Sequence, residues 1–202
     1  MRGATVRSVR DPIDPQQLLA GYVAGWFPMD VDGDVGFYET DPRAIIPIDG
    51  FRVPRSVARA LRAAPFEIRI DTAFDEVVAS CGGPRHGGAW LTPRLAGVYS
   101  SLHRAGYAHS VEAWRDGRLA GGLFGVALGG LFTSESMFHR ESDAGSAALV
   151  ATHRHLVERG FALWDIQMAS HHTERFGAAG VSPARYRDLL EQALALPVRF
   201  AP

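Results

Sequence analysis

The sequence contains no lysine, so all 21 of its basic residues are arginine. Genomic base composition is one explanation for this bias. A second is that the planar guanidinium group suits bidentate contacts with phosphate. With 22 acidic residues the formal net charge is −1, and a chain so close to neutrality is unsuited to a broad electrostatic attraction for nucleic acid.

Cysteine and long apolar runs are also scarce. Cys81 is the single cysteine, which excludes an internal disulfide and fits a reducing compartment. No stretch approaches the roughly 18 apolar residues of a membrane-spanning helix, and residues 1–10 lack the apolar run of a signal peptide. Because 47% of the residues are hydrophobic and 21% charged, we expect a globular cytoplasmic protein with a substantial core.

The first 48 residues are expected to form a small, aromatic-rich and mostly irregular subdomain, and residues 49–202 the main domain. Proline, glycine and aspartate are dense in this first part, and at such density they break regular structure. One short helix is predicted over 15–24, with Asp14 as the N-cap and Pro15 at the first helical position.

The rest of the chain alternates between strand and helix patterns. Alternation of apolar and polar residues predicts strands, and apolar spacing of three and four predicts helices. Asp116-Gly117 between two strand patterns indicates a hairpin. Helices are predicted over 54–64, 73–80, 93–105, 144–159 and 183–193, and strands over 66–71, 108–114, 119–127, 131–136 and 161–168. We therefore predict an α+β fold, a mixed sheet flanked by helices.

Four arginines fall on one face of the helix predicted over 54–64. Arg52, Arg55, Arg59 and Arg62 are spaced three, four and three apart, which brings them to the same side. No acid interrupts them. They form either a solvated helix face or a track for nucleic-acid phosphates.

Polar residues interrupt two apolar strand patterns. Glu135 lies between Leu131-Phe132 and Met137-Phe138, and Asp165 and Gln167 lie within the strand predicted over 161–168. Two residues apart on a strand, Asp165 and Gln167 share a face. A carboxylate in such a run is unfavourable unless it is paired or functional. The three mark either a catalytic site or a structural hydrogen-bond network.

Other chemistries have weaker support. Trp90 follows the glycine-rich stretch 87–89 and is either a core or lid aromatic or a wall of a ligand pocket. Eight histidines are present, but His153 and His155 are two apart in a predicted helix, and no metal motif occurs. Neither Cys81 nor any serine has a nucleophile signature. We expect no metal, no cofactor and no covalent intermediate.

A series of short motifs resembles the bacterial leucyl/phenylalanyl-tRNA–protein transferase family, in the family's order from about residue 18 to residue 190. The matching stretches include Gly25-Trp26-Phe27-Pro28-Met29, Asp41-Pro42-Arg43, Gly88-Ala89-Trp90-Leu91-Thr92, Ala108-His109-Ser110-Val111-Glu112, Gly121-Gly122-Leu123-Phe124-Gly125, Glu135-Ser136-Met137-Phe138, Asp165-Ile166-Gln167 and Gly177-Ala178. Each is weak alone, but together they are specific.

The resemblance implies a small N-terminal domain followed by a GNAT-like domain. It also implies an enzyme that moves Leu or Phe, less readily Met, from aminoacyl-tRNA to the N-terminal amine of proteins beginning with Arg or Lys, marking them for degradation. Such an enzyme would need no cofactor, and we expect a monomer. The implied catalytic residues are Asp165, Gln167 and Glu135. The implied substrate contacts are Trp90, Leu123 and Phe132 around the donor side chain, Tyr38 near the terminal adenosine, and Ser136 and Met137. The arginine face would bind tRNA.

In the mechanism expected from these residues, Asp165 acts through Gln167 to orient the amine and collect its proton. Glu135 holds the acceptor or the ribose. Positioning of this kind supplies about 7–11 kcal/mol when the geometry is good. The sequence departs from the family in three places. The family's Asn-Ala-Ser-Lys is here Asp143-Ala144-Gly145-Ser146, which lacks the positive charge and the amide; the usual Asp-Cys-Gln is Asp165-Ile166-Gln167; and the usual N-terminal stretch is shortened.

Two alternatives stay open. The first is an acyl-CoA-dependent N-acetyltransferase on the same general fold, although the stretch nearest to its phosphate motif, residues 174–179, begins with an acid. The second is a non-catalytic RNA or peptide adaptor. The three functions differ in whether aminoacyl-tRNA, acetyl-CoA or neither serves as a donor.

Overall fold

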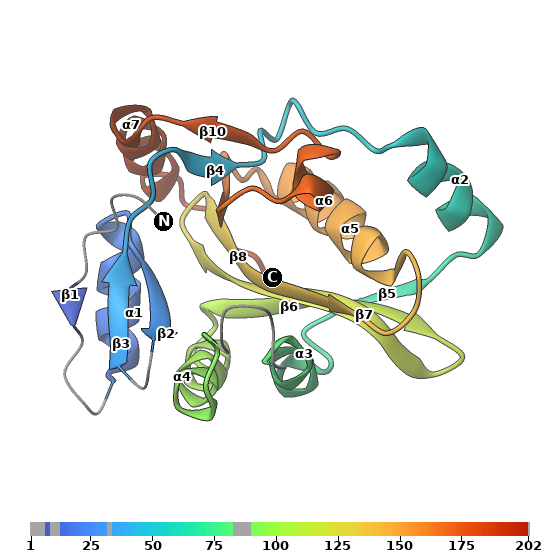
Figure 1. Cartoon of the computed structure of the whole chain (residues 1–202), viewed down its shortest axis with the longest axis horizontal. Helices are drawn as coiled ribbons and strands as arrows, with labels where there is room; N and C mark the ends of the chain where they lie inside the picture. The colour runs from blue at the N-terminus through green and yellow to red at the C-terminus, as the bar shows by residue number, and fades with distance from the viewer. Residues whose placement is uncertain (1–6, 9–12, 32–33, 83–89, 202) are drawn as a thin grey trace.

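The computed structural model describes residues 7–8, 13–31, 34–82 and 90–201 of the 202-residue chain. It has a mixed α+β fold in which a mostly antiparallel seven-stranded sheet is flanked by helices, with a three-stranded sheet beside it (Figure 1). The α+β prediction is therefore confirmed at this level.

The large sheet has the order β10-β4-β9-β8-β7-β6-β5. Its neighbours are antiparallel except β8 and β9, which run parallel. The bounds are β4 (Arg43–Ile45), β5 (Glu67–Ile70), β6 (Ala108–Arg115), β7 (Arg118–Leu128), β8 (Leu131–His139), β9 (Leu163–Gln167) and β10 (Ala179–Val181). The small sheet, of order β1-β3-β2, contains β1 (Arg7–Ser8), β2 (Phe27–Val31) and β3 (Asp34–Tyr38).

Helices cover both sides of the large sheet (Figure 1). α3 (Phe74–Cys81) and α4 (Pro93–Arg104) lie on one side, and α5 (Ala144–Arg159) with α2 (Arg55–Ala63) on the other. α1 (Pro15–Val23) lies beside the small sheet, and α6 (His171–Glu174) and α7 (Pro183–Leu194) follow β9. α1, α4 and α7 begin with proline after Asp14, Thr92 and Ser182, whose side chains cap the first turn. Such caps satisfy N–H groups that have no partner within a helix.

Two apolar clusters form most of the core. One joins the small sheet to α3, α4 and β7 and includes Leu18, Tyr99 and Phe124. The other lies beneath α5 and includes Leu123 and Phe132. α5 approaches β7 closely because Gly121 has no side chain: a Cβ there would lie 2.7 Å from the Cβ of Ala144.

The prediction that residues 1–48 are mostly irregular is wrong. β2 and β3 form an antiparallel pair in which Phe27 lies opposite Tyr38, and four of the five residues of β3 are buried. Burial of aromatic side chains outweighs the local breakers. Pro28 is compatible with β2 because this strand is at the edge of its sheet.

The predicted helices and strands between residues 54 and 193 are otherwise present, with small shifts at their ends. α6 and β10 are additional. β4 lies within the predicted N-terminal subdomain but pairs with β9 and β10 in the large sheet, and the division at residue 48 stays a prediction. Within the described residues, no helix combines the length and apolar character needed to cross a bilayer.

Candidate functional site

The site is built where β8 and β9 separate. The two strands pair only over Leu131–Thr133 and Leu163–Asp165. Just beyond, β8 contains a bulge: Phe124 and Gly125 of β7 are consecutive, but their partners on β8 are Ser136 and Ser134. Glu135 is the extra residue, and a bulge of this kind redirects side chains and locally ends strand pairing.

Asp165 is completely buried and forms a two-point ion pair with Arg43 of β4. Arg43 Nε donates to Oδ1 at 2.9 Å and Nη2 to Oδ2 at 2.6 Å, and the two side chains are 2% and 0% exposed. Burial lowers the pKa of Arg43, but the charge of Asp165 and the hydrogen bonds to it, with smaller effects of Tyr186 and Glu135, together outweigh burial and raise this pKa. Arg43 therefore keeps its positive charge opposite the Asp165 carboxylate.

Two further groups complete the shell of Asp165. The hydroxyl of Tyr186 on α7 donates to Oδ2 at 2.7 Å, and the backbone N–H of Gln167 donates to Oδ1 at 2.9 Å. Burial, and next the charge of Asp165, raise the pKa of Tyr186, so this hydroxyl keeps its proton. With four donors directed at it, Asp165 holds β4, β9 and α7 in register.

Glu135 differs from Asp165 in being partly exposed. Tyr99 of α4 donates to its Oε2 at 3.0 Å, and the hydroxyl of Thr133 donates to Oε1 in a short contact. Tyr99 also shares a hydrogen bond of 2.8 Å with Tyr22 of α1. Burial raises the pKa of Glu135 to about 7, more than these hydroxyl donors lower it, and the charge of Asp165 adds to the rise. Glu135 is therefore able to exchange a proton near neutral pH.

Gln167 connects the two carboxylates. Its backbone is in the left-handed region, with φ of 58°, which is uncommon for a residue other than glycine. Its amide fits two orientations. In one, Nε2 lies 3.4 Å from Glu135 Oε1. In the other, the nitrogen donates to the carbonyls of Ile166 and Ser134 at 2.9 and 3.0 Å. The second satisfies more groups and turns the amide oxygen toward Glu135.

The structure thus brings together Glu135, Gln167 and Asp165 but divides the predicted substrate contacts. Leu123 and Phe132 are closed into the core under α5, at 1% and 0% exposure. Tyr38 and Trp90 pack in the other cluster. The glycine-rich stretch 87–89 before Trp90 lies outside the described residues.

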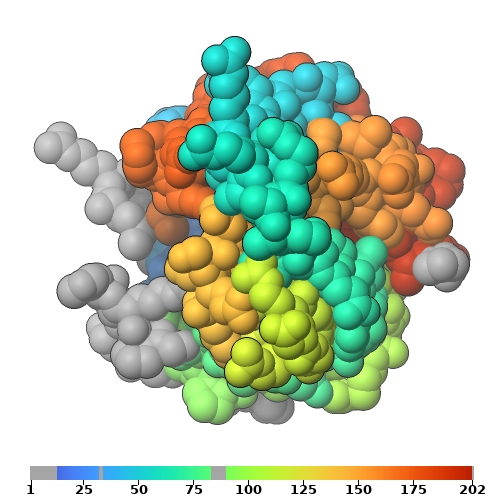
Figure 2. Space-filling view, turned by 90° about the vertical axis from the view of Figure 1, so that its right-hand side faces the viewer, coloured from blue at the N-terminus to red at the C-terminus, as the bar shows by residue number. Residues whose placement is uncertain are grey.

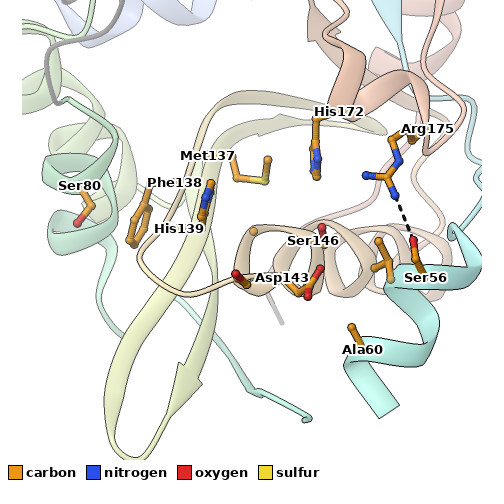
Figure 3. Close-up of a pocket in the computed structure, with 13 residues that line it drawn as sticks. Ser56, Ala60, Ser80, Met137, Phe138, His139, Asp143, Ser146, His172 and Arg175 are labelled. Atoms are coloured by element: carbon orange, nitrogen blue, oxygen red, sulfur yellow. Dashed lines mark hydrogen bonds between the residues drawn. The ribbon is translucent and has the colours of Figure 1, made fainter. Parts of the chain in front are cut away.

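A cavity of about 970 Å³ lies along the free part of β8 (Figure 3). Met137, two residues beyond Glu135, lines it together with residues of α2, α5 and α6. Ser136, next to Met137, is partly exposed. The three clustered polar residues do not themselves line this cavity, but the strand that carries Glu135 leads directly into it.

The predicted arginine face is exposed at all four positions, Arg52, Arg55, Arg59 and Arg62. α2 carries three of them and lies at the front in Figure 2, in teal. Its buried face is formed by Val57. This arrangement leaves the guanidinium groups available to solvent or to a ligand.

The two histidines of α5, His153 and His155, make structural contacts. Nε2 of His153 lies 2.9 Å from the carbonyl of Ile48, and Nε2 of His155 lies 2.8 Å from that of Phe200. Among the described residues there is no group of three or more His, Cys, Asp and Glu side chains suited to a metal ion.

Comparison with known proteins places the chain in a family. Residues 45–191 match the sequence model of the leucyl/phenylalanyl-tRNA protein transferases. A leucyl/phenylalanyl-tRNA–protein transferase of Herpetosiphon aurantiacus is 46% identical over 93% of this chain and 98% of its own length. One from Akkermansia muciniphila is 44% identical over 92% and 98%. The chain belongs to the leucyl/phenylalanyl-tRNA protein transferase family. A solved structure described as L-PGS from Bacillus licheniformis has a TM-score of 0.48 at 11% identity, covering 76% of this chain and 64% of the other.

Within the stretch that matches this transferase family lie Glu135, Asp165 and Gln167. Arg43, Tyr99 and Tyr186, which contact them, were not singled out from the sequence. Arg43 had a usable signal, since it precedes the apolar run Ala44-Ile45-Ile46 and a charge at the start of a buried strand needs a partner. The two tyrosines had no such signal.

Proposed function

We propose that this protein transfers leucine or phenylalanine from aminoacyl-tRNA to the N-terminal amine of an acceptor protein. Membership of the transferase family supports the reaction class. The observation that supports the assignment to a site is that Gln167 lies between two carboxylates where β8 and β9 separate: its backbone N–H donates to Asp165, and its side-chain amide lies beside Glu135, whose pKa is about 7. This site lies next to a cavity large enough for a nucleotide-sized ligand.

The reaction is the aminolysis of an ester. The neutral amine attacks the ester carbonyl, the new C–N bond forms, and the bond from the carbonyl carbon to the ribose oxygen breaks. One amine proton ends on the departing ribose hydroxyl. Because the ester is already activated, no ATP is needed. An α-amine has a pKa of about 7.7–8.0, so a neutral fraction is present at neutral pH.

The geometry favours a different division of roles from the one expected on the sequence. Asp165 is saturated by Arg43, Tyr186 and the N–H of Gln167, which supports a positioning role. Glu135, partly exposed and with a raised pKa, is the better proton acceptor. In the orientation that turns its amide oxygen toward Glu135, Gln167 offers with Glu135 two acceptors for the N–H groups of one amine.

The remaining features of the family are carried over as parts of this proposal. Trp90, Leu123 and Phe132 would border the donor side chain and Tyr38 the terminal adenosine, and Ser136 and Met137 would also contact the substrate. The acceptor would begin with Arg or Lys, and the product would enter N-degron degradation. A GNAT-like sheet is consistent with the parallel pairing of β8 and β9, the strands that precede and follow α5 in the chain. A monomeric, cytoplasmic enzyme completes the proposal.

A matrix of donors and acceptors tests the function. The donors are Leu-tRNA, Phe-tRNA, Met-tRNA and acetyl-CoA, each with peptides that differ only in beginning with Arg, Lys or Ala. We expect product from the tRNA donors with the Arg and Lys peptides, with Met tolerated because one methylene changes the binding energy by only about 1–3 kcal/mol. Product from acetyl-CoA alone, or none at all, would contradict the proposal.

The arginine face of α2 yields a separate prediction. If Arg55 and Arg59 neutralise phosphates of the tRNA, each contributes about 0.9 to the slope of log Kd against log salt concentration. Replacing both with glutamine should therefore lower this slope by about 1.8. The measurement is filter binding of Phe-tRNA between 50 and 300 mM KCl. At about 0.1 M salt, interactions between charges more than roughly 10 Å apart are already screened, so the slope reports on close contacts. A slope equal to that of the wild type would show that the face is only solvated.

A further inference from the structure

β5 is the last strand of the large sheet and leaves that edge of the sheet open. It pairs with β6 alone, and at its end the N–H of Asp71 donates to the carbonyl of Ser110 on β6 at 3.2 Å. Because inward and outward backbone groups alternate along an antiparallel strand, the groups of Ile68 and Ile70 point away from β6. Within the described part of the chain nothing pairs with them. Such an edge is a template for another strand.

The open stretch has defined ends. Pro65 precedes it and has no N–H to donate. Asp71 follows it in the left-handed region, with φ of 58°, and this turns the chain out of the extended conformation. A partner strand can therefore pair with residues 66–70 and no further.

One face of β5 carries two opposite charges. Arg69 Nε and Nη2 donate to the carboxylate of Glu67 at 2.8 and 2.9 Å, and the Arg69 guanidinium lies 4.4 Å from the centre of the Trp114 ring. The side chain of Glu67 is 61% exposed and that of Arg69 is 35% exposed. Both charges are therefore held at the edge and are still open to a partner.

The other face of β5 is apolar. Phe66, Ile68 and Ile70 line a cavity of about 610 Å³ between α2, β5 and α5, and Ile68 is 40% exposed. Figure 2 looks onto this side of the molecule, where α2 is teal and α5 is orange. Residues 66–70 thus present apolar side chains on one face and a pair of opposite charges on the other.

We propose that two copies of this chain pair through β5, antiparallel, around a two-fold axis at Ile68. In this register the outward groups of Ile68 bond to the same groups of the second copy. Glu67 of each copy lies opposite Arg69 of the other, and Phe66 lies opposite Ile70 on the apolar face. A two-fold interface uses the same surface twice and has to be complementary to itself. The charge order along β5 meets this requirement.

The neighbouring registers lack this match. Outward-pointing residues must face each other in an antiparallel pair, so the register can change only in steps of two residues. One such step places Arg69 opposite Arg69, and the step in the other direction places Glu67 opposite Glu67. Like charges directly opposite each other are destabilising. The charge pattern therefore selects a second copy of the chain in one register.

The pairing goes beyond the proposed function and does not depend on it. β6 and β7 lie between β5 and the strand that carries Glu135, so both copies keep a complete site and the single copy stays the catalytic unit. Two short strands form an interface at the low end of the size range, below about 1,200 Å². We therefore expect association to be reversible and to depend on concentration.

Sedimentation velocity at protein concentrations from about 5 to about 500 μM measures the pairing. The wild type should shift from monomer toward dimer over this range. Arg69→Glu places acid opposite acid at both charged positions, and Glu67→Arg places arginine opposite arginine. Each substitution changes two favourable pairs into two unfavourable ones and should raise the Kd of the dimer by about ten-fold or more.

An equimolar mixture of the two variants is the sharpest sample, because every charge then again faces one of opposite sign. The mixture should associate with a Kd within about three-fold of the wild-type value. Arg104→Glu is the matched control, since it reverses an exposed arginine at the end of α4, on the opposite side of the sheet. It should keep the wild-type Kd.

Two results would overturn the pairing. One is a wild type that stays monomeric at every concentration. The other is a mixture that associates no better than its two components, which would show that the charges of β5 do not face each other. Neither result bears on transfer, and a wild type that pairs but forms no product would overturn the proposed function alone.

Discussion

Glu135→Gln is expected to lower kcat/KM for peptide transfer by about 100-fold or more at pH 8, the usual contribution of a general base. It should also change the shape of the pH profile. In the wild type two groups must lose a proton, the acceptor amine and Glu135, whose pKa is about 7. Below pH 6.5 the logarithm of kcat/KM should therefore rise with a slope approaching about 2. In the variant only the amine titrates, and the slope should be about 1.

The same substitution has a predictable effect on stability. Because the pKa of Glu135 is about 7 in the folded protein and about 4.3 in an unfolded chain, the folded state binds this proton more tightly. The contribution of the protonated carboxyl is complete below about pH 4 and is lost as the pH rises through 7. The variant, which has no charge to bury, should be more stable than the wild type at pH 8, by about 2 kcal/mol, and similar to it at pH 5.

Thermal unfolding at the two pH values measures this difference, which corresponds to about 4–8 °C in Tm for a chain of this size. If the variant is more stable than the wild type and still transfers more slowly, unfolding cannot be the cause of its lower activity. If the slope of the pH profile were the same in both proteins, Glu135 would not be the proton acceptor, whatever its effect on the rate.

The strands and helices that carry the site follow from local patterns. The alternation around Glu135 and the apolar run through Asp165 predict β8 and β9 because side chains on a strand alternate between faces. The alternation is seen in β9 itself: Trp164 packs in the cluster beneath α5, while its neighbour Asp165 contacts Arg43 and Tyr186. The spacing of apolar residues is a property of a short segment, so the strand and the face that it buries can be predicted without knowing which other segments pack against it.

The state of the site could not be read in this way, because it depends on contacts between distant segments. Arg43 and Asp165 are 122 residues apart, and Tyr99 and Glu135 are 36 apart. The sequence therefore presents Asp165 and Glu135 as similar carboxylates. In the structure a buried guanidinium pairs with Asp165, whereas Glu135 has no such partner and burial raises its pKa more than its hydroxyl donors lower it. The bulge at Glu135 likewise depends on the register of β7 and β8 rather than on any local signal.

The small sheet was missed for a related reason. Proline and glycine between residues 25 and 36 argue against regular structure, and α1 with β2 and β3 becomes favourable only when their aromatic side chains join the cluster around α4. Tyr22 of α1 reaches the site through Tyr99. Packing of the N-terminal segment therefore also determines the surroundings of Glu135.

Arg43→Met is expected to produce the largest loss of stability. It removes the partner of a carboxylate that is 0% exposed, and an uncompensated buried charge destabilises by about 3–5 kcal/mol. The Tm should fall by about 6–20 °C at pH 7. Calorimetry or urea unfolding measures the change. Tyr186→Phe keeps the ion pair and removes only the hydroxyl, which donates to Asp165 at 2.7 Å and accepts from Arg43 at 3.4 Å, so it should lose less, about 1.5–3 kcal/mol.

The double variant Arg43→Met/Asp165→Leu distinguishes a positioning role for Asp165 from a purely structural one. Replacing a buried ion pair by apolar groups is often neutral, so the double variant should recover most of the stability lost by Arg43→Met. It should not recover transfer, because the N–H of Gln167 no longer has the carboxylate that holds it at 2.9 Å. Wild-type kcat with the stability restored would show that the ion pair only supports the fold, and Gln167 would then be positioned by β9 alone.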